Sequence, residues 1–89
     1  MTVYRIEMTP RSLKDLRAIR DRRLHDRLTT AIARLADNPR PVGSRKLVGE
    51  VDQWRVRVGD WRIVYGIEDE RLVVLVVTVA PRDGVYRGV

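Results

Sequence analysis

One stretch of the chain decides its fold: Trp-Arg-Val-Arg-Val-Gly-Asp-Trp-Arg-Ile-Val-Tyr, residues 54–65. Large apolar side chains recur there at every second position, which is typical of half-buried strands. The pattern is interrupted only by Gly59-Asp60, and a two-residue connection with glycine first favours a type II′ turn. We therefore predict a tight antiparallel hairpin in which Arg57 lies directly opposite Arg62.

The arginines of this hairpin share one face of the predicted sheet. Side chains alternate along a strand, so Arg55, Arg57 and Arg62 should project to the same side. Like charges that face each other across two strands destabilise a sheet by up to about 1 kcal/mol. A purely structural hairpin gains nothing from that arrangement, whereas a surface that binds an anion does. The alternative is that acidic side chains screen the arginines or that they extend into water.

The N-terminal half reads as a strand followed by two helices. Residues 3–8 alternate as a strand does. Thr9-Pro10 has the form of a helix start, and Asp21 is a candidate cap for a second helix. Leu13, Leu16 and Ile19 recur at three-residue spacing, which predicts that they share the buried side of the first helix. Two antiparallel helices across residues 10–37, ended by Asn38-Pro39, fit the apolar pattern better than one long helix.

The C-terminal half adds a third strand to the hairpin. Residues 72–79 are almost wholly apolar, as expected of a central strand buried on both faces. The predicted fold is α+β: strand, two helices, then three antiparallel strands, with the helices packed on one face of a small sheet. The chain of 89 residues has room for one modest core, so residues 1–89 form a single predicted domain.

Composition excludes several kinds of site. The chain has no cysteine and one histidine, so it can form neither a disulfide nor a thiolate zinc site, and we expect no metal and no cofactor. No apolar run is long enough for a membrane span, so we expect a soluble, cytoplasmic protein without a membrane partner. The net charge of +6 rests mostly on arginine. This favours phosphate as a ligand, although codon bias in a GC-rich genome would also raise the arginine content.

Arginines also gather where the two predicted helices meet. They form a candidate surface for ribosomal RNA, with salt-sensitive and largely sequence-independent affinity. A solvated polar helix face that is partly neutralised by Asp21 and Asp26 explains them equally well. The residues are Arg17, Arg20, Arg22, Arg23 and Arg27.

The stretch after the last predicted strand carries Arg82, Tyr86 and Arg87. A phenol beside several guanidinium groups ionises more readily, because the cations favour the phenolate. Such a tyrosine can act as a general base. The alternative is that the ring of Tyr86 packs at the rim of the core with its hydroxyl in water.

Taken in order, these segments resemble the RelE/ParE toxin superfamily of type II toxin–antitoxin systems, and its RelE branch in particular. The resemblance covers essentially the whole chain. It rests on the order of the elements and on three pieces of sequence. These are Leu-Val-Gly followed by Trp-Arg-Val-Arg-Val within 47–58, Trp-Arg-Ile-Val-Tyr at 61–65, and Val-Tyr-Arg at 85–87.

The resemblance implies a toxin that enters the ribosomal A site and cuts translated mRNA without metal. Residue by residue, it implies that Arg55 and Arg57 position the RNA phosphates and that Arg62, Arg82 and Tyr86 are catalytic. Two departures from the family pattern stand out. Arginine occupies positions 55 and 57, where the family often has lysine, and the segment between Arg82 and Tyr86 is short, which leaves the placement of Tyr86 open.

The resemblance also implies partners. We expect a small acidic, RelB-like antitoxin with an amphipathic helix, together with the ribosome and mRNA, whereas DNA would be bound only through the antitoxin. Two other functions remain open. A ParE-like toxin would act on DNA gyrase and share the fold, since fold alone does not decide function. A non-catalytic basic module would bind nucleic acid and leave it intact.

Overall fold

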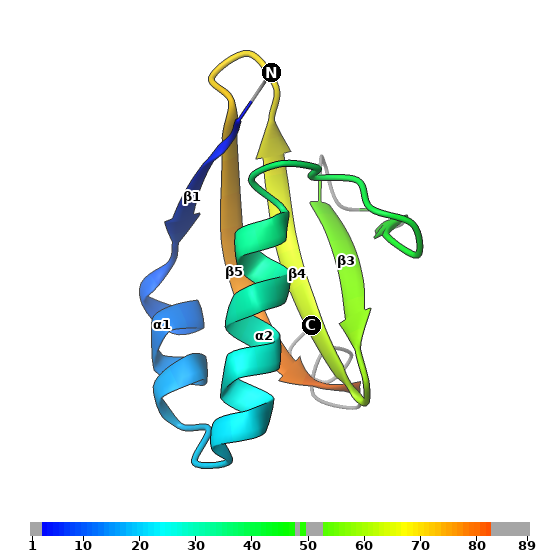
Figure 1. Ribbon diagram of the computed structural model, residues 1–89. Helices are drawn as coiled ribbons and strands as arrows, with labels where there is room; N and C mark the ends of the chain where they lie inside the picture. Colours follow the sequence, from blue (N-terminus) through cyan, green and yellow to red (C-terminus); the bar gives the residue numbers. More distant parts are fainter. Residues whose placement is uncertain (1–2, 48, 50–52, 83–89) are drawn as a thin grey trace.

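In a computed structural model, which describes residues 3–47, 49 and 53–82, the chain forms a five-stranded sheet with two helices on one of its faces (Figure 1). Strand β1 pairs in parallel with β5, and the other neighbouring strands pair antiparallel. The strand order is β1-β5-β4-β3-β2. The elements are β1 (Arg5–Met8), α1 (Pro10–Arg17), α2 (Arg22–Arg34), β2 (Arg45–Lys46), β3 (Gln53–Val58), β4 (Trp61–Glu68) and β5 (Val73–Pro81).

The predicted α+β class and element order are confirmed, with one addition. Strand β2 has only two residues, Arg45 and Lys46, and lies at the sheet edge against β3. A strand this short has no alternation that a sequence pattern could reveal. The chain returns from β1 through both helices and the β3–β4 hairpin before it forms β5, which lies between β1 and β4. This position explains why β5 is apolar on both faces.

Both helices begin where the sequence indicates. The Thr9 Oγ1 accepts a hydrogen bond from the Ser12 N–H at 3.1 Å, and Pro10 is the first residue of α1. The Asp21 carboxylate accepts from the N–H groups of Arg23 and Leu24. These caps satisfy donors that have no partner within the helix.

The predicted buried side of α1 is partly wrong. Leu16 is buried, but Leu13 is 39% exposed and Ser12 is fully buried instead. Ser12 lies one helical turn before Leu16, so the two share a face. Its hydroxyl donates to the Thr9 carbonyl at 2.9 Å, and this hydrogen bond offsets the free-energy cost of burying a polar group. The buried side of α1 therefore differs from the side that apolar spacing alone would choose.

The core lies between the helices and the sheet. Residues from α1, α2, β4 and β5 form it, and Trp54, Val56 and Val58 of β3 pack against its margin while remaining only partly buried. In Figure 1 α2 lies in front of β5 and β4, α1 follows below the end of β1, and β3 lies beyond α2. The fully buried centre includes Leu28, Leu35, Ile63, Tyr65, Val74 and Val76.

Helix α1 completes the outer edge of β5 where β1 ends. Pairing of β1 stops at Met8 opposite Val76. Beyond it, the Thr9 hydroxyl donates to the Val77 carbonyl at 3.0 Å, and the Asp15 carboxylate accepts from the Val79 N–H at 3.0 Å. These two side chains replace the missing strand and hold the part of β5 that leads to Arg82.

Tyr65 makes the free energy of unfolding depend on pH in the alkaline range. Its hydroxyl donates to the Pro39 carbonyl at 2.7 Å, and burial raises its pKa to about 12. Because the folded state favours the neutral phenol, its stabilising contribution is complete below a pH of about 10 and is lost as the pH rises towards 12. We expect Tyr65→Phe to be less stable by about 1 kcal/mol near neutral pH, since it loses a buried hydrogen bond. Urea unfolding at pH values of about 9 and 11 should show a smaller alkaline loss of stability in the variant than in the wild type. Equal losses would contradict this prediction.

Candidate nucleic-acid interface

The β3–β4 hairpin brings its arginines together as predicted. Val58 pairs with Trp61 and Arg57 pairs directly with Arg62. Gly59 has φ +61°, the positive value that the first position of a type II′ turn requires. The register and the turn predicted from the sequence are therefore confirmed.

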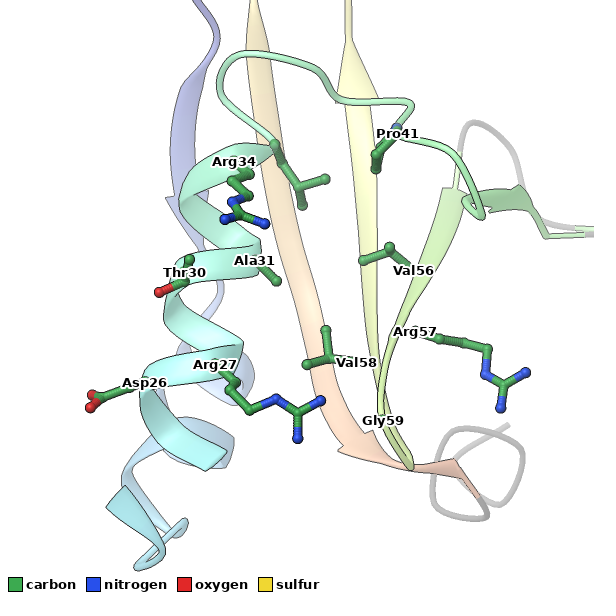
Figure 2. Close-up of a pocket in the computed structure, with 11 residues that line it drawn as sticks. Asp26, Arg27, Thr30, Ala31, Arg34, Pro41, Val56, Arg57, Val58 and Gly59 are labelled. Atoms are coloured by element: carbon green, nitrogen blue, oxygen red, sulfur yellow. The ribbon is translucent and has the colours of Figure 1, made fainter. Parts of the chain in front are cut away.

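These arginines lie on the face of the sheet opposite the helices, which we call the open face. Val56 and Ile63 pair with each other and belong to the helix side, so their neighbours Arg55, Arg57 and Arg62 project the other way. Figure 2 shows the Arg57 side chain extending away from α2. Three of the predicted functional side chains thus share one surface.

Arg62 is the most deeply placed of them. It is 5% exposed, whereas Arg57 is exposed and Arg55 is half-buried. A guanidinium group keeps its proton at any physiological pH, so Arg62 carries its full charge where little water reaches it. The Arg57 guanidinium, on the neighbouring strand, belongs to the residue directly opposite.

Arg82 reaches the same end of the sheet from another strand. It follows β5 directly, and its backbone N–H donates to the Asp60 carbonyl in the hairpin turn at 2.8 Å. Ala80, two residues earlier, pairs with Arg62. The Arg82 side chain is exposed. The predicted juxtaposition of Arg82 with the hairpin is therefore present in the backbone.

One cation on this face was missed by sequence reasoning. Arg45 of β2 pairs with Arg55, so it extends the row of arginines across the open face to the sheet edge. The only sequence signal was its charge, because a two-residue strand gives no period from which to infer a facing direction.

Tyr86, the proposed general base, lies outside the described residues and stays a prediction. The described part of the chain contains two other tyrosines, and neither suits that role. The Tyr65 hydroxyl is buried on the helix side with a raised pKa. The Tyr4 hydroxyl donates to Asp69 at 2.6 Å, and this hydrogen bond raises the pKa of Tyr4. Both phenols therefore stay protonated near neutral pH.

The helix arginines lie away from the open face. All five are exposed, and they surround the connection between α1 and α2: Arg17, Arg20, Arg22, Arg23 and Arg27. No acidic residue occupies the first turn of α2, where Arg22 and Arg23 stand instead. Cations at a helix N-terminus oppose the helix dipole by a few tenths of a kcal/mol. Their contact with ribosomal RNA stays a prediction.

Two further features bear on the kinds of site available. Within residues 3–47, 49 and 53–82, no three histidine, aspartate or glutamate side chains gather closely enough to suggest a metal site. In the same part of the chain, neither helix has the length and apolar character of a membrane span.

The helix side of the sheet carries a groove. It has a volume of about 580 Å³ and lies between α2 and β3 (Figure 2). Its walls include Ala31 of α2, Leu35 at the C-terminal cap of α2, and Val56 and Val58 of β3. The molecule therefore presents a cationic open face and, towards the helices, a groove that combines apolar and charged residues and includes Arg57 in its lining.

Comparison with known proteins places this architecture in a family. The chain matches the family described as "ParE toxin of type II toxin-antitoxin system, parDE" over residues 6–86. No curated protein matches by sequence.

Among solved structures, a mutant of the RelE toxin from Escherichia coli in the free state is 26% identical, with a TM-score of 0.79. The match covers 97% of this chain and 93% of that one. The RelBE toxin–antitoxin complex from Mycobacterium tuberculosis includes a chain that is 26% identical, with a TM-score of 0.75 and coverage of 91% and 100%. A chain of the RelE–RelB complex from Pyrococcus horikoshii is 24% identical and shares the fold, with a TM-score of 0.79 and coverage of 91% and 97%. The chain belongs to the RelE/ParE superfamily, in its RelE branch, and is the toxin of a type II toxin–antitoxin system.

Proposed function

We propose that the chain is a ribosome-dependent endoribonuclease that cuts translated mRNA in the ribosomal A site without metal. The observation that carries this proposal is the open face, where Arg57 stands opposite a deeply buried Arg62 and where Arg82 is tied to the same hairpin turn. Arg57 and Arg62 come from neighbouring strands and share this face. Such a surface can hold a phosphodiester and stabilise charge that develops on it.

The reaction can be written with side chains alone. Tyr86 takes the proton of the RNA 2′-hydroxyl, and the 2′-oxygen attacks the adjacent phosphorus. A bond forms between the 2′-oxygen and phosphorus while the bond to the 5′-oxygen breaks, which leaves a 2′,3′-cyclic phosphate. Arg62 and Arg82 stabilise the additional negative charge of the phosphorane. Arg82 also stabilises the charge on the leaving 5′-oxygen, which takes a proton from water. Arg55 and Arg57 hold the neighbouring phosphates.

The partners follow from this assignment. Several of the similar structures are complexes of RelE with RelB antitoxins. We infer that this chain is likewise held inactive by a small acidic antitoxin and that its targets are the ribosome and mRNA in the cytoplasm. The net charge of +6 favours both an acidic protein and RNA as ligands.

A second candidate function has one observation in its favour. The matched family is described as ParE toxins, and the ParE-like alternative acts on DNA gyrase. The catalytic side chains of the first proposal would then have no role.

One experiment separates these functions. The purified chain is added to ribosomes programmed with a defined mRNA, and mRNA 5′ ends are mapped; gyrase supercoiling is assayed in parallel. Ribonuclease function predicts new ends within codons in the A site and unchanged gyrase activity. Inhibited gyrase with intact mRNA would establish the ParE-like function instead. Salt-sensitive RNA binding without cleavage or gyrase inhibition would leave the non-catalytic module.

A further inference from the structure

We propose that Arg45, on the edge strand β2, binds a second phosphate of the mRNA, next to the one that is cut. This rests on the ribonuclease function proposed above and deepens it, because it extends the substrate site from the β3–β4 hairpin to the edge of the sheet. Arg45 lies outside the three pieces of sequence that carry the family resemblance, the first of which begins at Leu47. Its role is therefore inferred from the fold and not from the family.

The pairing of β2 with β3 fixes the direction of the Arg45 side chain. Arg45 pairs with Arg55, and the Leu47 N–H donates to the Gln53 carbonyl at 2.8 Å, which continues the same pairing beyond Lys46. Side chains of directly opposed residues in an antiparallel pair point to the same face, with Cβ atoms about 5 Å apart. Arg45 therefore projects from the open face beside Arg55.

Two rows of opposed residues cross the open face at neighbouring positions of β3. Together they hold four arginines, and no acidic residue occupies any of these strand positions. The rows are Arg45, Arg55, Val64 and Thr78, followed by Arg57, Arg62 and Ala80. They are two residues apart along β3, so the rows lie about 7 Å from each other. If the second row holds the scissile phosphate, the first row faces the phosphate that precedes or follows it.

Arg45 lies too far from the cleaved bond to take part in the chemistry. Neighbouring strands are about 4.8 Å apart, so the backbones of Arg45 on β2 and Arg62 on β4, one row apart, are separated by roughly 12 Å. A cation that neutralises a flanking phosphate strengthens RNA binding and fixes its register, but it does not stabilise charge that develops at the reacting phosphorus. We therefore expect Arg45 to affect affinity and not the chemical rate.

The Arg45 guanidinium is available to a ligand. Its side chain is exposed. Other exposed arginines hold carboxylates, in the ion pairs Arg5–Glu7, Arg40–Asp69 and Arg71–Glu68. Within residues 3–47, 49 and 53–82, Arg45 has no ion pair of this kind. A phosphate offers the oxygens that a planar guanidinium fork binds best. RNA suits this row better than an acidic peptide does, because the row continues from the pair that faces the scissile phosphate.

The test measures binding of toxin variants to ribosomes programmed with mRNA that carries a 2′-deoxynucleotide at the cleavage site, which prevents cutting. Arg45→Gln is expected to bind about fivefold less tightly, and the slope of log affinity against log salt should fall by about 0.7, the value for one lost contact to single-stranded RNA. On ribosomes whose mRNA ends before the A-site codon, Arg45→Gln should bind like the wild type. Single-turnover cleavage of unmodified mRNA at saturating toxin should stay within about twofold.

The neighbouring residue supplies the matched control. Lys46 lies in the same two-residue strand but pairs with Trp54, which packs against the core on the helix side. Lys46→Gln removes the same charge from the other face and should leave affinity and salt slope unchanged. Arg45→Lys keeps the charge, so it should restore the salt slope while it recovers only part of the affinity.

A modified mRNA identifies the phosphate. A methylphosphonate, which replaces one charged oxygen with a methyl group, is placed in turn at the phosphates on either side of the scissile one. At one of these positions the wild type should lose about fivefold in affinity. Arg45→Gln should lose little more there, because the contact is already gone. Such non-additivity marks a direct interaction between the two groups.

Several outcomes would overturn the proposal. Arg45→Gln that binds as tightly as Lys46→Gln would mean that Arg45 is merely solvated, and additive losses at both flanking phosphates would exclude a contact with either. Equal weakening on ribosomes without an A-site codon would assign Arg45 to ribosomal RNA. Weaker antitoxin binding with unchanged ribosome binding would assign it to an acidic protein. Arg45-dependent binding to the A-site mRNA without cleavage of unmodified mRNA would support this proposal and overturn only the ribonuclease function.

Discussion

Replacing Arg62 with alanine is expected to slow mRNA cleavage on programmed ribosomes about 100- to 1,000-fold. This is the range seen when one preorganised donor to a developing negative charge is removed. Arg62 is held at 5% exposure opposite Arg57, so its guanidinium needs little reorganisation to meet the phosphorane. Lysine at this position should recover only part of the rate, because it keeps the charge but loses the planar fork.

The conclusion depends on separating chemistry from folding, since Arg62 is buried. Arg62→Met fills a similar volume without charge and should be as slow as alanine while it remains folded. Thermal unfolding of each variant offers an independent check that it remains folded. Arg71→Ala serves as the control for losing an arginine, since Arg71 is exposed in the β4–β5 turn and paired with Glu68. Full cleavage by Arg62→Met would remove Arg62 from the mechanism.

The sequence predicted the part of the site that depends on local geometry. Alternation fixes which side chains share a face, and a two-residue turn fixes the register, so the pairing of Arg57 with Arg62 required no tertiary information. Its confirmation extends to Val58 and Trp61. The helix caps at Thr9 and Asp21 were predictable for the same reason, because the hydrogen bonds of a cap involve only neighbouring residues.

Features that depend on contacts between distant segments were not predicted. Ser12 is buried in place of Leu13, because α1 packs against β5 with the side of the helix that Ser12 shares with Leu16. Strand β2 exists only because its edge meets β3, and this pairing brings Arg45 into line with Arg55. The depth of Arg62 could not be read from alternation either, since a pattern gives the facing direction of a side chain but not what surrounds it.

Tyr86→Phe is expected to slow cleavage about 100- to 10,000-fold while mRNA and antitoxin affinities stay close to those of the wild type. Phenylalanine keeps the ring and removes only the oxygen that accepts the 2′-hydroxyl proton, and general base catalysis typically contributes this much. Tyr4→Phe is the matched control. It loses the same hydroxyl, but that hydroxyl is bound to Asp69 in the β4–β5 turn, far along the sheet from the Gly59 turn.

The two tyrosine variants together decide whether a phenol is the base. Tyr4 and Tyr65 are both held neutral, by the Asp69 carboxylate and by burial respectively, so neither can replace Tyr86 once its oxygen is gone. Single-turnover kinetics on programmed ribosomes separate the chemical step from binding. If Tyr86→Phe has a reduced chemical rate with unchanged affinity, and Tyr4→Phe does not, then Tyr86 is the group that takes the proton of the 2′-hydroxyl. Wild-type single-turnover rates in Tyr86→Phe would mean that another group takes the proton of the 2′-hydroxyl. The RNA or the ribosome would then activate the nucleophile, and the guanidinium groups of the open face would only stabilise the charge of the transition state.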